Sequence, residues 1–475
     1  MNHQKQSFLY LIVLIALALL FLSGCQPLAT QSTENHLSST MPPESQIHSF
    51  PNMTYDVIFL IDGKLRLLKH DTGEIETLLA PDVLKYSLST NGQWLVVAKQ
   101  VDFNPDNYEL VLLNLANRHS QIIVKDIHCL HDFAISPDGK RLLYIADDWN
   151  SEKQICQMAV ERQGQEFGET FYDSIYHPPF FHNLGGTIYV TDFENTSSTT
   201  IGYCNSAIRE DEHLSRFSLC ISAYWTLDSE NVIWFDSEGI WLADLISNQP
   251  VMLRALFQDN EDHFYTHVTW SPSGKYLAMR GDSFSGNGSK RLILDWRTGE
   301  TIEAPYPSFG FFGLGARPYM IWLNDDRLLF TKPMAIAERW TFTEDGSSLV
   351  LEDTANLASN DSDFIAASPY QLPDSTLTYA LLSPYIKNEQ EHGLYQMKSL
   401  THTPEQIINL PQIKNYASDV QVLWSPDGNG AIVQYWNLDS EGNEKQFYYV
   451  SNSLEMLHDI TQTMGETAES VQWVP

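Results

Sequence analysis

The sequence predicts an all-β protein whose folded part is a single β-propeller of four-stranded blades. Two observations lead to this prediction. A short turn motif recurs along the chain with an apolar segment after each copy, at spacings close to the ~40 to 45 residues of one propeller blade. The last residues of the chain also resemble the segment that precedes the turn, which indicates how a ring of blades is closed.

The turn motif is most complete at three places: Ser136-Pro137-Asp138-Gly139, Ser271-Pro272-Ser273-Gly274 and Ser425-Pro426-Asp427-Gly428. Proline fixes φ near about −65° at the first turn position, aspartate can hydrogen-bond the turn backbone, and glycine adopts positive φ without strain. The motif therefore predicts a tight hairpin. The segments that follow it, such as Arg141 to Ala146, are apolar enough for a strand buried on both faces.

Weaker copies of the turn accompany the three clear ones. They begin at Ser89, Asn183, Leu227, Asn324 and Pro373. Counting every copy, and adding a blade divided between the chain ends, would exceed the usual range of about four to eight blades. We expect eight blades, with one weak copy irregular, and seven or nine blades remain open.

Two further features predict the strand number and the closure of the ring. Lys69 to Glu74 and Asp295 to Glu300 both read as turns between third and fourth strands. The first strand-like segment, Tyr55 to Ile61, has no inner strand before it, whereas Val471 to Pro475 resembles the end of an inner strand. We therefore expect the C-terminal strand to pair with the N-terminal blade, which leaves no long exposed edge.

The N-terminus carries an export signal that ends in a lipobox. Lys5 precedes an apolar run from Phe8 to Leu22, shorter than the about 20 residues of a comfortable membrane span. Ser23 and Gly24 then lead to the thiol of Cys25. The sequence predicts a signal peptide over residues 1–24, a lipidated Cys25 with a flexible tether over 25–52, and the propeller over 53–475.

Both parts of the chain resemble known families. The lipobox resembles that of bacterial lipoproteins, which implies that Cys25 carries diacylglycerol. Gln26 stands where many retained lipoproteins have aspartate, which implies the outer membrane in a cell with two membranes and the outer leaflet in a cell with one. The repeats resemble those of TolB-type periplasmic proteins and of peptidase propeller domains, which implies the fold and says little about function.

The charge of the chain restricts its partners. Lys and Arg number 28 against 60 Asp and Glu, which gives a net charge of −32 at pH 7. A nucleic acid would be repelled, and contact with a membrane is expected only through the lipid anchor. Cations, basic proteins and neutral glycans are all compatible with this charge, and a protein or peptide of the cell envelope is the expected partner.

Familiar catalytic motifs do not occur in the sequence. A Gly-x-Ser-x-Gly elbow and a His-Glu-x-x-His zinc motif are both missing. The segment from Asp439 to Glu444 has spaced oxygen ligands that could hold calcium, although a polar hairpin tip explains it equally well. We expect no cofactor and favour a non-enzymatic protein.

The candidate binding site is one face of the ring. In known propellers, loops from second to third strands and from each blade to the next share the usual binding face. The long insertions concentrate in such loops, most are acidic, and two aromatic connections join them. The aromatic residues could instead plug the channel or cover blade edges. The candidate residues are Asp147, Asp148, Asp192, Glu194, Asp282, Phe309, Phe311, Phe312, Glu389 and Glu391.

Cysteines beyond the lipobox lie in a chain that is expected outside the cytoplasm, where disulfides can form. They are Cys129, Cys156, Cys204 and Cys220. Cys204 and Cys220 fall on what read as neighbouring strands of one blade. A disulfide between these two is one interpretation, and buried free thiols are the other.

Two functions are consistent with these features. The first is a lipid-anchored, extracytoplasmic scaffold that binds a protein or peptide without catalysis. The second is a carbohydrate-active enzyme or glycan-binding protein that uses the channel mouth. Two inward carboxylates about 5 to 10 Å apart in a deep pocket would favour the enzyme, whereas a broad aromatic and acidic face would favour binding.

Replacement of the lipobox cysteine, Cys25→Ser, should abolish acylation and cleavage at this site, because the thiol is the group that accepts diacylglycerol. Incorporation of labelled fatty acid and fractionation of membranes measure the effect, with Cys129→Ser as the control. A Cys25→Ser protein that is processed and membrane-bound as before would show that the lipoprotein interpretation is wrong.

Overall fold

The protein is described here by a computed structural model in which residues 1–49 and 50–475 form two units. All described residues belong to the second unit. They run from 53 to 475 except for 102–106, 129, 147–185, 205–207, 212–213, 218–222, 237–238, 256–262, 284–289, 305–319, 333–334, 359–364, 373, 383–391, 411–418, 437–444 and 452–455. In this part of the chain, no helix is long and apolar enough to span a bilayer.

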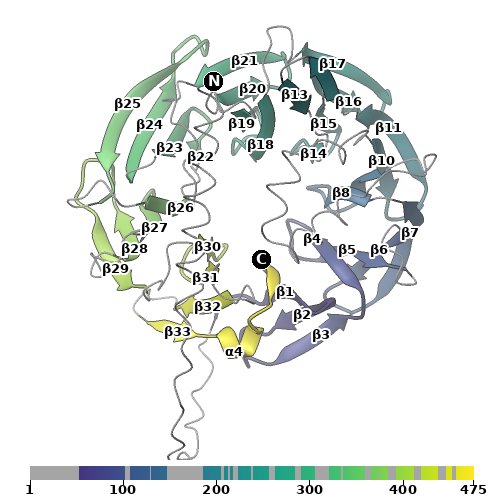
Figure 1. The fold of residues 1–475 in the computed structure, drawn as a ribbon, viewed down its shortest axis with the longest axis horizontal. Helices are drawn as coiled ribbons and strands as arrows, with labels where there is room; N and C mark the ends of the chain where they lie inside the picture. The colour runs from purple at the N-terminus through teal and green to yellow at the C-terminus, as the bar shows by residue number, and fades with distance from the viewer. Residues whose placement is uncertain are drawn as a thin grey trace, which may run out of the picture. The chain divides into compact units, whose positions relative to one another are not determined.

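The second unit is an eight-bladed β-propeller, as the sequence predicts (Figure 1). Each blade is a four-stranded antiparallel sheet, and the strands of each blade are named from the innermost to the outermost. Blade 1 contains β34 (Glu469–Trp473), β1 (Val57–Ile61), β2 (Lys64–Leu68) and β3 (Ile75–Leu79). Blade 2 contains β4 (Val83–Leu88), β5 (Trp94–Gln100), β6 (Asn107–Asn114) and β7 (Ser120–His128). Blade 3 contains β8 (Leu130–Ile135), β9 (Arg141–Ala146), β10 (Gly186–Asp192) and β11 (Ser198–Cys204).

The remaining blades follow in chain order. Blade 4 contains β14 (Ala223–Trp225), β15 (Asn231–Phe235), β16 (Gly239–Asp244) and β17 (Gln249–Ala255). Blade 5 contains β18 (His263–Trp270), β19 (Tyr276–Ser283), β20 (Lys290–Asp295) and β21 (Glu300–Ala304). Blade 6 contains β22 (Met320–Asn324), β23 (Arg327–Lys332), β24 (Ile336–Phe342) and β25 (Leu349–Asn356). Blade 7 contains β26 (Ile365–Gln371), β27 (Leu377–Leu382), β28 (Gly393–Met397) and β29 (Glu405–Asn409). Blade 8 contains β30 (Asp419–Trp424), β31 (Ala431–Trp436), β32 (Lys445–Val450) and β33 (Leu457–Asp459).

Two small elements stand outside the blades. The hairpin of β12 (Ile208–Asp211) and β13 (Leu214–Phe217) lies between blades 3 and 4 in the chain and pairs with neither. A single helical turn, α4 (Thr461–Met464), leads from β33 to β34 and buries Met464.

The core of the ring lies between blades. Each hydrophobic cluster contains residues of two successive blades, and the clusters together join every neighbouring pair. One cluster joins Phe59 of blade 1 to Phe447 and Tyr449 of blade 8, so the last blade packs on the first. Because a sheet with both faces apolar must cover both, a single blade has no stable core without its two neighbours.

The closure of the ring by the C-terminus is confirmed. Strand β34 pairs antiparallel with β1, and Trp473 lies opposite Val57. The backbone amide of Val474 then donates to the carbonyl of Asp56 at 2.9 Å. The buried hydroxyl of Tyr86 in blade 2 donates to the carbonyls of Ile58 and Ser470, so it binds both strands of the closure.

Tryptophans near the ends of inner strands bind blades to one another. The indole Nε1 of Trp473 donates to the carbonyl of Leu423 in blade 8 at 2.9 Å. The indoles of Trp225, Trp322 and Trp424 make the same kind of bond to the inner strand of the preceding blade, at 3.0 to 3.2 Å. The tryptophan that ends several inner strands therefore has a physical cause at the blade interface.

The turns between third and fourth strands also lie where the sequence predicts them. The amides of Gly73 and Gly299 donate to the carbonyls of Lys69 and Asp295 at 2.9 and 2.8 Å. Both glycines have positive φ, at 69° and 75°, which a residue with a Cβ rarely adopts.

One weak copy of the turn does not begin a blade. The copy at Asn183 leads into Gly186, where β10 starts as the third strand of blade 3. Its glycine pair imitates the turn that starts a blade, although residues 183–185 themselves lie outside the described residues. This copy is the irregular one, and the remaining turns with the divided blade give eight.

Removing Ser470 to Pro475 should destabilise the propeller by several kcal/mol, because buried Val471 and Trp473 are lost and β1 becomes an open edge. Thermal unfolding monitored by circular dichroism measures the loss. Gln472→Ala, a change at an exposed position of the same strand, should leave the melting temperature nearly unchanged. A truncated protein that melts like the parent would contradict closure by β34.

Candidate functional site

The propeller has two faces with different connections. The turn face contains the turns between first and second strands and between third and fourth strands. The loop face contains the connections between second and third strands and those from each blade to the next. Most connections of the turn face are tight hairpins, whereas those of the loop face include the long segments 147–185 and 205–222.

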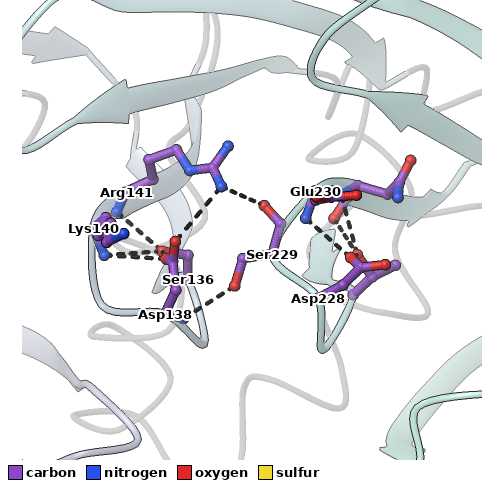
Figure 2. A network of polar contacts seen from close by, with 9 residues as sticks. Ser136, Asp138, Lys140, Arg141, Asp228, Ser229 and Glu230 are labelled. Carbon is purple, nitrogen blue, oxygen red and sulfur yellow. Dashed lines mark hydrogen bonds and ion pairs between the residues drawn. The ribbon is translucent and has the colours of Figure 1, made fainter.

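The side chains of the turn motif are used inside the turns. In blade 3 the hydroxyl of Ser136 donates to Asp138 Oδ1 at 2.5 Å and accepts the amide of Arg141 at 2.9 Å (Figure 2). Ser425 and Asp427 form the same bond in blade 8, at 2.6 Å. The serine and aspartate of the motif thus hold the hairpin, and their polar groups are satisfied within it.

Neighbouring turns are also bound to one another. The amide of Asp138 in blade 3 donates to Ser229 Oγ in blade 4 at 3.0 Å, and Arg141 Nη2 donates to the Ser229 carbonyl at 2.7 Å (Figure 2). The same arrangement joins blades 5 and 6, where the amide of Ser273 donates to Asp325 Oδ1 at 2.7 Å. These contacts assign the turn face a structural role.

The carboxylates of the turns are held in the ionised form. Burial raises the pKa of Asp138, but hydrogen bonds from Ser136 and the Lys140 amide, with the charge of Arg141, outweigh it and lower the pKa. In the exposed turn of blade 6, the hydrogen bond from Thr343 and those from Ser347 lower the pKa of Asp345 to about 2. A perturbed carboxylate on this face is therefore a property of a turn and is no sign of catalysis.

The loop face differs because ionisable side chains are buried along it. Among the described residues, the buried acidic, basic and histidine side chains, called here the buried ionisable residues, all lie near the loop-face ends of strands. They are His131, Asp236, Arg291, Glu338 and His392. Buried polar side chains at the turn-face ends are instead small, such as Ser89, Thr226 and Ser271. Burying a charge costs free energy unless it is paired, so such residues gather where a protein positions polar groups for a purpose.

Some of these buried groups have a visible structural task. The carboxylate of Asp236 accepts the amide of Gly239 at 3.0 Å and the indole of Trp241 at 2.9 Å. The guanidinium of Arg291 lies 4.2 Å from the centre of the Phe330 ring in the next blade, a cation–π contact. Both groups fix strand ends beneath the connections of the loop face.

A further charged contact lies where blade 8 meets blade 1. Lys445 Nζ lies 3.6 Å from Glu469 Oε1 and donates to the carbonyl of Ala468 at 3.1 Å. Burial lowers the pKa of Lys445, and Glu469 opposes this effect. The pair fixes the start of β34 on the loop face.

The inner strands of blades 8, 1, 2 and 3 present a polar surface toward the centre of the ring. Their residues alternate, as a strand requires: Val422, Tyr86 and Phe133 are buried between blades, and the residues between them are partly or fully exposed. We call the exposed set the inner wall. It consists of Gln421, Ser470, Gln472, Lys85, Ser87 and Asp132.

The charged members of the inner wall are paired. Lys85 Nζ donates to Asp132 Oδ1 at 2.7 Å, from β4 to β8. The ammonium group also lies 5.9 Å from the centre of the Phe133 ring. The inner wall therefore combines an ion pair, amides and hydroxyls with no net charge.

Most of the predicted site residues lie outside the described residues. These are Cys25, Asp147, Asp148, Phe309, Phe311, Phe312, Glu389 and Glu391, together with Cys220 and the calcium candidates from Asp439 to Glu444. Asp282 lies in β19, opposite Phe264, toward the loop face. In the described part of the chain, no group of three or more His, Cys, Asp or Glu side chains could hold a metal ion.

The placement of Asp192 and Glu194 on the loop face is wrong. The structure puts them at the turn between β10 and β11, third and fourth strands of blade 3, and therefore on the turn face. Asp192 Oδ1 accepts the amides of Glu194 and Asn195, at 2.8 and 3.3 Å. The error follows from the turn-like segment at Asn183, which suggested the start of a new blade and made β10 a second strand, whereas it is the third strand of blade 3.

Of the four cysteines beyond the lipobox, Cys204 alone lies among the described residues. Cys204 ends β11, is buried and takes part in a disulfide. Its partner is not among the described residues, so pairing with Cys220 stays a prediction.

Sequence reasoning missed the inner wall and the buried ionisable residues. A signal for the wall was present, because alternate residues before the turn motif are polar in several repeats. Lys85 and Asp132 each stand four residues before the serine of their turn, as does Gln421. The buried ionisable residues have no comparable spacing that would have distinguished them from surface charges.

No protein-family model matches the chain, and no curated protein matches it. Several solved structures do. The chain is similar to dipeptidyl peptidase 4 of Porphyromonas gingivalis, with a TM-score of 0.51 and 8% identity over 88% of this chain and 61% of that one. It is also similar to TolB of Acinetobacter baumannii, with a TM-score of 0.33 and 16% identity over 62% of this chain and 63% of that one.

A prolyl endopeptidase is a third similar structure, with a TM-score of 0.47 and 12% identity over 82% of this chain. The chain covers 63% of the TolB structure and 50% of the endopeptidase structure. Of these three structures, dipeptidyl peptidase 4 alone has a TM-score above 0.5, and at 8% identity this likeness supports the propeller fold alone.

The turn carboxylates predict a specific loss of stability in acid. Because the folded-state pKa values of Asp138, Asp345 and Asp427 are lowered, their stabilisation is present above about pH 4 and is lost as pH falls through the folded values. The triple change to Asn should flatten the fall in unfolding free energy between about pH 4 and 2. Asn91 already fills this turn position in blade 2, with its Oδ1 accepting from Ser89 at 2.7 Å.

Urea unfolding at stepped pH values measures this effect. The control changes Glu194, Glu230 and Glu300, exposed turn-face carboxylates, to Gln. If the unfolding free energy of the triple Asn variant fell as steeply with decreasing pH as that of the parent, the turn hydrogen bonds would not depend on ionisation.

Proposed function

We propose that the protein is a non-enzymatic binding module of the cell envelope, which captures a protein or peptide on its loop face and is held at the membrane by a lipid on Cys25. The observation that supports this most directly is that the two faces of the ring use their polar side chains differently. Polar side chains of the turn face are used in holding turns and blades together, as Ser136 and Ser229 illustrate. The loop face has the long connections and the buried ionisable residues.

The charge of the chain supports a basic partner. A net charge of −32 produces a field that attracts cationic surfaces over the about 8 to 10 Å of a Debye length. The acids Asp147, Asp148, Asp282, Glu389 and Glu391 belong to loop-face connections or to a strand that leads into one. Electrostatic attraction of this kind raises association rates more than it slows dissociation.

The anchoring part of the proposal rests on the lipobox. Met53, the first described residue, is buried in the cluster between blades 1 and 8, and its amide donates to the carbonyl of His70 at 3.4 Å. The chain therefore enters the propeller on the turn-face side, where the β2–β3 turn lies.

The experiment compares two matched sets of charge changes in the full-length protein. The loop-face set changes Asp147, Asp148 and Asp282 to Asn and Glu389 and Glu391 to Gln. The turn-face set changes Glu74, Glu194, Glu230, Glu300 and Glu344 to Gln. Both sets remove the same number of negative charges, so an effect that depends only on net charge should be equal in the two variants.

Partners captured from a detergent extract of the native envelope are then measured for association rate at low and high salt. The loop-face set should slow association about tenfold or more at low salt, with little difference at high salt, because screening removes the attraction. The turn-face set should have a small effect. Equal effects of the two sets, or no effect of either, would contradict capture on the loop face.

A further inference from the structure

The inner wall contains amide side chains that no described residue uses. Gln421 in blade 8 and Gln472 in blade 1 are exposed and make no hydrogen bond to any residue in the described ranges. The same holds for the exposed side-chain hydroxyl of Ser470, whose backbone carbonyl accepts a hydrogen bond from Tyr86. Each amide can donate and accept hydrogen bonds, as the hydroxyl can.

The charged part of the wall is fixed in place. Lys85 is held by Asp132 and by its position near the Phe133 ring. Asp132 is partly buried, with an exposed side-chain fraction of 22%, and Lys85 has 40%. A fixed pair with both partners reachable can offer one donor group and one acceptor group to a ligand without moving.

The wall is neutral in a protein of strongly negative charge. On the inner strands of blades 8, 1, 2 and 3, the exposed residues of the wall contribute one positive and one negative charge, and these form the ion pair. An anionic ligand would be opposed by the net charge of −32, and a cationic one would gain more from unpaired acids elsewhere. The wall therefore suits a neutral ligand rich in hydrogen-bonding groups.

We propose that the inner wall of blades 8, 1, 2 and 3 is a binding site for a neutral oligosaccharide. Sugar hydroxyls both donate and accept, which matches the amides of Gln421 and Gln472, the hydroxyl of Ser470 and the Lys85–Asp132 pair. These groups succeed one another from blade to blade, so a chain of sugars can meet them in turn. The residues of this site differ from the acids assigned to the basic partner.

The test uses a double variant with a matched control. Gln421→Leu with Gln472→Leu keeps the size of the side chains and removes both amides from the wall. Gln121→Leu with Gln249→Leu makes the same change on the outer strands β7 and β17, where both residues are exposed and unbonded to described residues. Because all four positions are exposed, both variants should fold, and circular dichroism checks this.

The probes are neutral hexasaccharides of glucose, mannose and N-acetylglucosamine, with hexagalacturonate and a neutral Gly-Ser hexapeptide as competitors, titrated calorimetrically against the full-length protein. A neutral hexasaccharide should bind, and the wall variant should bind it about tenfold or more weakly, because two hydrogen bonds are lost. The outer-strand variant should bind like the parent.

Three outcomes would overturn the proposal. They are absence of binding by any neutral hexasaccharide, equal binding by the wall variant, and preference for the hexapeptide or hexagalacturonate. Any of these outcomes would leave the proposal of a protein-binding loop face intact, because that proposal is tested with different variants, in which acids are changed, and with a protein partner.

Discussion

The packing of each blade on both of its neighbours is the interaction on which this structure depends. No blade buries its own faces, and every hydrophobic cluster described here needs two successive sheets. The tryptophan bonds, the linked turns and the Tyr86 hydroxyl all cross the same interfaces. Because stability is shared between neighbours in this way, the ring is stable only when its first and last blades meet.

The packing of blades on their neighbours explains why the two faces of the ring can have different roles. The hairpins of the turn face approach one another closely. In blades 3 and 4, for example, the backbone amide of Asp138 donates to the hydroxyl of Ser229. Residues that hold such a contact cannot also present themselves to a ligand. The loop-face connections include long segments such as 147–185, so their length and charge are under fewer constraints.

The fold could be predicted because its repeated turn has a local cause. Proline, aspartate and glycine in one order dictate a hairpin, and Trp473 identified the closing strand by the same local resemblance. The register of blade 3 could not be predicted, since the glycines at 185 and 186 imitate a turn that only the pairing of β9 with β10 rules out. The inner wall was missed for a related reason. Whether Gln421 or Val422 faces the centre depends on how neighbouring blades cover the strand, which one repeat alone does not reveal.

The pairing of β34 with β1 has a consequence for how the protein is made. The strand that completes blade 1 follows all the other propeller strands in the sequence, so β1 keeps an unpaired edge until every other blade has been synthesised. A chain interrupted late in translation would contain seven complete blades and one open edge, a substrate that proteases and chaperones recognise readily. The position of one short strand thus delays completion of the ring until all the other blades have been synthesised.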